Sequence, residues 1–153
     1  MLTSGAVDPI SALEVPLIAM AWFAWKEKYS VGHEEIDKQH RKLIEIVNLL
    51  HENMMAGSPP EGLMAVLDRL VTYVREHFCY EESVMERCKY PDLAEHRRKH
   101  LAIVSQVQNF QIEARQGKVT VSIKLMNFLK DWLDKHIMDT DMKYSSYVGV
   151  LKG

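Results

Sequence analysis

The sequence has little excess charge of either sign: 19 lysines and arginines stand against 21 aspartates and glutamates, and neither sign forms a long run. This balance excludes the strongly basic surface that nucleic-acid binding requires. Cysteine is also scarce. The two thiols, Cys79 and Cys88, fall on opposite sides of the helix expected there, so they cannot form a disulfide within that helix. We therefore expect a reduced, cytoplasmic protein in which both act as small apolar side chains.

The sequence contains no long apolar run of the kind that crosses a bilayer. The stretch from Leu17 to Phe23 has no basic region before it and is far shorter than the roughly 20 apolar residues that a span needs. We expect residues 1–21 to be a flexible tail, residues 22–153 to be one domain, and no membrane partner. Recognisable patterning begins only at Trp22, so Met20 is an alternative start of translation to Met1.

Helical periodicity appears in four stretches, and none of the chain shows sustained strand alternation. We expect helices over residues 34–55, 58–88, 91–117 and 120–144. The second should open with a capping box from Ser58 to Glu61 and a proline at its first position, and Gly117 should end the third. Short connections make neighbouring helices antiparallel. The pattern therefore predicts an all-α, up-down-up-down four-helix bundle with an N-terminal arm.

Polar side chains that bind metals occupy inward positions at one end of this predicted bundle: His40, His77, Glu81, His96, His100 and His136. A single histidine on an apolar face is usually a hydrogen-bonded core residue. Burying the whole layer without partners would cost roughly 1–3 kcal/mol for each group, and a metal would satisfy all of them together. The pairs His77/Glu81 and His96/His100 have i,i+4 spacing, which turns both members of a pair toward one site.

Asp141 does not follow this spacing. It comes five residues after His136, which places it about 140° away on a regular α-helix. A π-bulge or an unwound last turn would bring its carboxylate inward, and such bulges are frequent at functional sites. The alternative is a solvated aspartate near a helix end. The pattern alone favours neither interpretation.

The number and type of these ligands indicate the metal. Seven protein ligands are too many for one tetrahedral zinc, and imidazoles with carboxylates but no thiolate suit iron or manganese. If both carboxylates bridge two metals, the protein and an oxo or hydroxo bridge fill about eleven of the twelve positions of two octahedra. One position then stays open for a small neutral molecule such as oxygen.

These residues resemble the bacterial single-domain members of the hemerythrin family over residues 22–147. The resemblance rests on Ile36-Asp37-Lys38-Gln39-His40, His77-Phe78 with Glu81-Glu82, Tyr90-Pro91, His96, His100, Trp132-Leu133, His136-Ile137 and Asp141. It implies a hemerythrin-like domain over residues 22–153 with two iron ions joined by an oxo or hydroxo bridge. One iron would be held by His96, His100 and His136, the other by His40 and His77, with Glu81 and Asp141 bridging.

The resemblance further implies that the second iron carries the open position and that Leu43, Phe78, Leu133 and Ile137 line an apolar oxygen pocket. Trp25 would pack over the site from the N-terminal arm. We interpret the two remaining histidines as non-ligands, with His33 near a helix start and His51 partly solvated.

The function implied by the resemblance is reversible dioxygen binding for storage, transport or delivery. The diferrous pair would give two electrons to oxygen, and the product would be held as a bound hydroperoxide by a carrier that is not an enzyme. One alternative is a di-iron enzyme with peroxidase or nitric-oxide-handling activity, but ferritin-like enzymes use about four carboxylates in Glu-x-x-His motifs. The other is an oxygen or redox sensor, which usually needs an output domain. We expect a monomer, with an oxygen-consuming enzyme as a candidate recipient.

Overall fold

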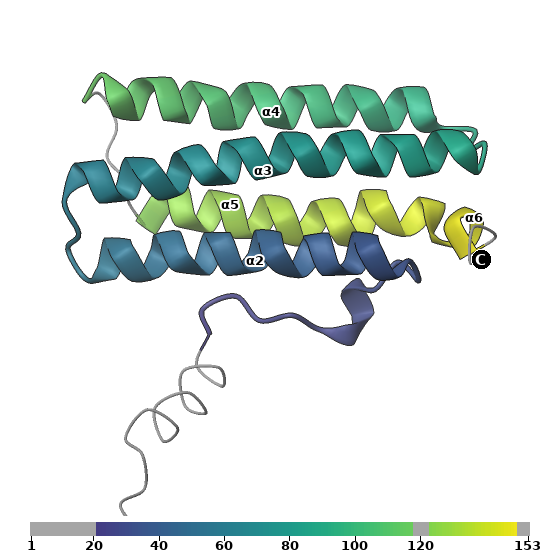
Figure 1. The fold of residues 1–153 in the computed structure, drawn as a ribbon, viewed down its shortest axis with the longest axis horizontal. Helices are drawn as coiled ribbons and strands as arrows, with labels where there is room; N and C mark the ends of the chain where they lie inside the picture. Colours follow the sequence, from purple (N-terminus) through teal and green to yellow (C-terminus); the bar gives the residue numbers. More distant parts are fainter. Residues whose placement is uncertain (1–20, 118–122, 150–153) are drawn as a thin grey trace, which may run out of the picture.

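The computed structural model describes residues 21–117 and 123–149, and all secondary structure in these ranges is helical (Figure 1). The expected tail, apart from Ala21, lies outside the described residues, as does the expected start of the last helix at Thr120. The four long helices are α2 (Glu34–Met55), α3 (Pro60–Arg87), α4 (Leu93–Arg115) and α5 (Ile123–Lys135). Shorter elements are η1 (Glu27–Tyr29), η2 (His136–Thr140), η3 (Asp141–Tyr144) and α6 (Ser145–Val148).

Successive long helices run in opposite directions (Figure 1). α2 packs against both α3 and α5, and α3 packs against α4. The predicted up-down-up-down four-helix bundle is therefore confirmed. Because α2 and α4 start at the end of the bundle where α3 and α5 finish, the first turns of one pair face the last turns of the other.

The inward positions predicted from periodicity form the core. Leu50, Leu67 and Leu129 come from three different helices, and none has any exposed surface. Burying a leucine side chain completely stabilises the folded state by about 1.5–3 kcal/mol relative to leaving it exposed, so this apolar half of the bundle supplies much of the stability. The polar layer lies at the other end of the bundle, and the stability of the apolar half holds it in place.

The connection between α2 and α3 corrects one prediction. Ser58 is not the cap of α3, because the helix begins at Pro60 with Pro59 before it. Instead the Ser58 hydroxyl donates to Oδ1 of Asn53, at 3.1 Å, and closes the end of α2. Pro60 suits the first helical position because its missing N–H would have no partner there. The predicted stop of α4 is confirmed, since Gly117 adopts a left-handed φ of +71° just after the helix ends.

The N-terminal arm is fixed to the bundle by hydrogen bonds. The backbone N–H of Phe23 donates to Oδ1 of Asn48 at 2.9 Å, and Nδ2 of Asn48 donates back to the Phe23 carbonyl at 2.7 Å. Farther along the arm, the Tyr29 hydroxyl donates to Asp134 at the end of α5. The arm therefore joins α2, at Asn48, to α5, at Asp134.

Two further predictions from composition can be compared with the structure. Both cysteines are free thiols, as expected, but Cys79 is exposed and so does not act as a buried apolar side chain. Among the described residues, no helix is both long enough and apolar enough to cross a membrane.

Candidate metal centre

All seven predicted ligands lie together inside one end of the bundle. Each is at most 6% exposed. The side chains come from the first turns of α2 and α4, from the last part of α3, and from η2 and η3, which follow α5: His40, His77, Glu81, His96, His100, His136 and Asp141. The antiparallel order of the helices thus brings together residues that are up to about a hundred positions apart in the sequence.

A change of helix type turns Asp141 into this layer. Residues His136–Thr140 form a π-helical turn, and the backbone N–H of Asp141 donates to the carbonyl of His136, five residues before it. In a π-helical turn, residues five apart lie on nearly the same side, so Asp141 is aligned with His136, as it would not be in a regular α-helix. Asp141 is completely buried. The π-bulge interpretation is confirmed, and the solvated aspartate is wrong.

The imidazoles divide into two groups around the two carboxylates. In one group, Nε2 of His40 and His77 lie 3.3 and 3.0 Å from Oε2 of Glu81, and Nε2 of His40 lies 3.1 Å from Oδ2 of Asp141. In the other, Nε2 of His96 and His100 lie 2.8 and 3.1 Å from Oε1 of Glu81, and Nε2 of His96 and His136 lie 3.2 and 3.1 Å from Oδ1 of Asp141. Each carboxylate therefore presents one oxygen to each group.

Two of these short separations have hydrogen-bond geometry, those between Nε2 of His40 and of His96 and the Glu81 carboxylate, but other atoms of the cluster stay unpaired. Nε2 of His77, His100 and His136 and both carboxylate oxygens of Asp141 are buried without a hydrogen-bond partner among the described residues. Buried polar atoms are almost always paired, so the cluster calls for a partner of another kind. With metal–ligand bonds of about 2.1 Å, neighbouring ligands of an octahedron lie about 3 Å apart, which matches the observed separations. The residues therefore fit two adjacent metal ions.

The mutual arrangement of these groups shifts their pKa values strongly in the metal-free protein. Burial lowers the pKa of His40, but its contacts with Asp141 and Glu81 more than offset this and raise it to about 9. In His100, burial prevails over Glu81 and lowers the pKa to about 4. The pKa of Glu81 is held well below its ordinary value, against the effect of its burial, by His77 and the other imidazoles. Glu81 is thus an anion in the folded protein, as a metal ligand must be.

Outside the cluster, polar neighbours orient the ligands. Oε1 of Gln39 accepts a hydrogen bond from Nδ1 of His77 at 2.8 Å, which leaves Nε2 of that ring free to face the centre. Oε1 of Glu82 lies 3.7 Å from Nδ1 of His100. Gln39 and Glu82 belong to the motifs that resemble the hemerythrin family, but the sequence alone gives them no role. Only their proximity in the bundle reveals it.

Tyr144 is a neighbour that sequence reasoning missed. Its side chain is fully buried, and its ring lies 5.6 Å from that of His96 between centroids. Burial, followed by the charges of Glu81 and Asp141, raises the pKa of its hydroxyl well above the ordinary value, so the phenol keeps its proton. The sequence shows that Tyr144 follows Asp141 by three residues. This spacing puts the two side chains on the same side only in a 3₁₀ turn, which the sequence does not reveal.

The apolar core includes the side chains predicted to line an oxygen pocket. The four predicted to line an oxygen pocket are at most 3% exposed: Leu43, Phe78, Leu133 and Ile137. The ring of Phe78 stacks on that of His100, with 3.7 Å between centroids. Phe78 is therefore in direct contact with the cluster.

The prediction for Trp25 is not supported. Its half-buried ring packs against Tyr29, and the guanidinium of Arg41 on α2 lies 4.4 Å from its centroid, so it lies between the arm and α2. The indole beside the cluster is Trp132, which lies 6.4 Å from both Phe78 and His136 between ring centroids. Trp132 precedes His136 by one helical turn, so its place follows directly from α5.

The other two histidines lie outside the cluster, as predicted. His33 caps α2, with Nδ1 accepting a hydrogen bond from the N–H of Ile36. His51 is half-buried and stacks on Trp22, with 4.4 Å between ring centroids.

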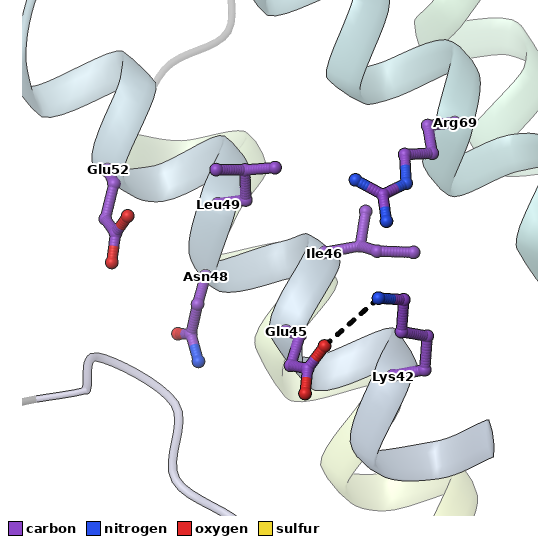
Figure 2. Close-up of a pocket in the computed structure, with 7 residues that line it drawn as sticks. All are labelled: Lys42, Glu45, Ile46, Asn48, Leu49, Glu52 and Arg69. Carbon is purple, nitrogen blue, oxygen red and sulfur yellow. Dashed lines mark hydrogen bonds and ion pairs between the residues drawn. The ribbon is translucent and has the colours of Figure 1, made fainter. Parts of the chain in front are cut away.

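A surface cavity of about 330 Å³ lies elsewhere, between α2 and α3 (Figure 2). It is lined by Lys42, Glu45, Ile46, Asn48, Leu49, Glu52 and Arg69. Lys42 and Glu45 already form an ion pair across part of it, at 3.3 Å. No residue of the buried cluster lines this cavity, so the cluster is the better candidate for a functional site.

Comparisons with known proteins agree with this geometry. The family described as the Hemerythrin HHE cation binding domain matches residues 31–148. A bacteriohemerythrin of Stenotrophomonas maltophilia is 33% identical over 129 residues, which cover 84% of this chain and 83% of that protein. One from Methylococcus capsulatus is 33% identical over 125 residues, covering 82% and 93%. The crystal structure of a wild-type hemerythrin has a TM-score of 0.80 and 28% identity, covering 84% of this chain and 99% of that one. This chain therefore belongs to the hemerythrin family.

Proposed function

We propose that this protein binds dioxygen reversibly at a di-iron centre and serves as a carrier or store of oxygen. One observation carries the proposal: five imidazoles divide into groups of three and two around two fully buried carboxylates. A single metal would leave one of the two groups unpaired. Two metals, bridged by Glu81 and Asp141, satisfy both.

In this proposal His96, His100 and His136 hold one iron, and His40 and His77 hold the other. The group with two imidazoles has fewer protein ligands, so the open position belongs to its iron. When bound, the iron pair supplies the electrons that oxygen binding requires, with an oxo or hydroxo bridge completing the ligand set. The predominance of imidazoles separates this site from carboxylate-rich di-iron enzymes.

The protein's own contribution is to exclude water. Leu43, Leu133 and Ile137 are almost completely buried, and Phe78 covers one face of His100. Such apolar side chains let a small neutral molecule pass but include no group that donates a proton. Proton donors favour irreversible oxidation of the oxygen-loaded protein. The curated relatives described above are named bacteriohemerythrin, which supports a carrier more than a catalyst.

A spectroscopic cycle tests the proposal. Iron-loaded protein is reduced without air, exposed to air and then freed of oxygen by flushing with argon, and its visible absorption is recorded at each stage. We expect a new charge-transfer band in air that disappears on flushing and returns in a second cycle. A band that persists after flushing, or no band in protein that contains iron, would contradict reversible binding.

A further inference from the structure

Three tyrosine rings form a continuous path from the candidate metal centre to the protein surface. Tyr144 lies against His96, with 5.6 Å between ring centroids. Tyr90 lies 6.2 Å from Tyr144, and Tyr147 lies 5.2 Å from Tyr90, both edge to face. At these separations aromatic rings are in contact. Exposure rises along the path, from 0% at Tyr144 to 7% at Tyr90 and 39% at Tyr147.

Local backbone geometry sets each ring in place. After the π-helical turn, η3 is a 3₁₀ helix, in which residues three apart are aligned, so Tyr144 lies directly after Asp141 on the same side. Tyr90 is turned inward where α3 ends, since its N–H bonds to the Met85 carbonyl and Lys89 adopts a left-handed φ of +57°. Tyr147 belongs to the short helix α6 that follows. The turn that supplies the ligand Asp141 therefore leads directly into the path.

We propose that Tyr144, Tyr90 and Tyr147 form an electron-transfer path that carries electrons from the surface to the buried centre when the centre meets a strong oxidant. Phenols can lose one electron and one proton, which the phenylalanine and leucine side chains around the other ligands cannot do. Electron transfer slows steeply as the separation between rings grows, so three rings in contact favour stepwise transfer. The inference rests on the proposed function, because the iron pair is the electron acceptor.

Hydrogen peroxide is the oxidant for which the step balances. With the iron already ferric, breaking the O–O bond of one peroxide requires two electrons and two protons and yields two water molecules. Tyr144 gives up one electron and its hydroxyl proton, and both are used in reducing the peroxide. An electron and a proton from Tyr90 then restore Tyr144.

The same exchange then moves the oxidised site outward from Tyr90 to Tyr147. Tyr147 restores Tyr90 with one electron and one proton and becomes a phenoxyl radical at the surface. Two such radicals on different molecules combine through their ring carbons to form dityrosine. One peroxide takes two electrons from its own chain, so the second electron and proton come from Tyr90, which remains as a buried radical. A pair of chains thus reduces two peroxides to four water molecules, with two electrons and two protons from the two Tyr147 hydroxyls and two of each from the two Tyr90 hydroxyls.

The test uses the full-length, iron-loaded ferric protein with hydrogen peroxide as the oxidant. Frozen samples are examined by electron paramagnetic resonance for a phenoxyl radical, and parallel samples for dityrosine fluorescence and covalent dimers. The variants are Tyr144→Phe, Tyr90→Phe and Tyr147→Phe, each of which keeps the ring and removes the hydroxyl. The matched control is Tyr80→Phe, a half-buried tyrosine of α3 that packs on His33 outside the path. Trp132→Phe removes the other oxidisable ring beside the ligands.

We expect wild-type protein to form the radical and the dimers. Tyr147→Phe should lose the dimers but keep a buried radical, whereas Tyr144→Phe should lose both at wild-type iron content. Tyr80→Phe and Trp132→Phe should behave as wild type. If Tyr144→Phe fails to load iron, Tyr90→Phe and Tyr147→Phe decide the matter, because both lie farther from the ligands.

Three results would overturn the path. They are the absence of any phenoxyl radical in the wild type, dimers at the wild-type level in Tyr147→Phe, and loss of the radical in Trp132→Phe instead of in the tyrosine variants. The reversible oxygen spectrum of each variant is recorded separately. A normal spectrum without a radical refutes only the path, whereas loss of the spectrum in wild-type protein refutes the proposed function.

Discussion

Leu133→Ala probes the apolar wall of the candidate oxygen pocket. The side chain is 1% exposed and lies one helical turn before His136, on nearly the same face of α5. Truncating a fully buried leucine costs about 2–5 kcal/mol, because transfer energy is lost and a cavity remains. A cost of about 3 kcal/mol would lower the melting temperature of a domain of this size by about 6–12 °C. The larger effect should be chemical, since the cavity admits water beside the open metal position.

Water in that position supplies protons, so the variant should still take up oxygen but should convert faster to the inactive ferric form. The assay is the decay of the oxygen-bound absorption after reduced protein is mixed with air. Leu50→Ala is the matched control: Leu50 is equally buried in α2 but lies ten residues beyond His40. The control should lose similar stability without faster decay. Equal decay in wild type and Leu133→Ala, at normal iron content, would refute the assignment of this pocket.

Three further predictions concern the ligands. His100→Ala should lower the iron content measured by metal analysis, whereas Leu63→Ala, at the far end of α3, should reduce only melting temperature; equal iron content in both would contradict the ligand assignment. The metal-free protein should be most stable near pH 6.5. The raised pKa of His40, about 9, gives stability that is complete below pH 6.5 and is lost as the pH rises through 9. The lowered pKa of His100, about 4, removes stability as the pH falls from 6.5 toward 4. Thermal melting across this range checks both slopes, and a melting temperature that does not vary with pH would contradict them. Finally, deleting the exposed Asp139 should convert the π turn to an α turn that still aligns Asp141 with His136, so we expect the iron content to be retained. Loss of iron on deletion, but not in Asp139→Ala, would show that the π geometry itself is required.

Most of the bundle could be predicted from periodicity, because inward positions repeat every three or four residues. His77 and Glu81 could be paired from sequence for the same reason, since four residues apart on a helix means one face. The start of α3 could not be predicted correctly. A serine followed by two prolines and a glutamate satisfies the pattern of a capping box, but the Ser58 hydroxyl reaches Asn53 at the end of α2 instead.

The remaining parts of the site depend on geometry that spacing does not contain. Asp141 follows His136 by five residues, a spacing that does not show whether its side chain points into the bundle. Only the π-helical turn brings it inward. Trp25 was placed over the site by resemblance, yet its contacts with Tyr29 and Arg41 hold it between the arm and α2. Tyr144 received no role because its alignment with Asp141 depends on the 3₁₀ turn that follows.

Oxygen uptake by a known amount of reduced, iron-loaded protein tests the central proposal most directly. Iron per chain is measured first, and the dioxygen taken up and then released is measured on the same sample. We predict about two irons per chain, one dioxygen bound for each pair of irons, and release of the same amount when the oxygen pressure is lowered. One metal per chain, or oxygen that is consumed and not recovered, would contradict a reversible di-iron carrier.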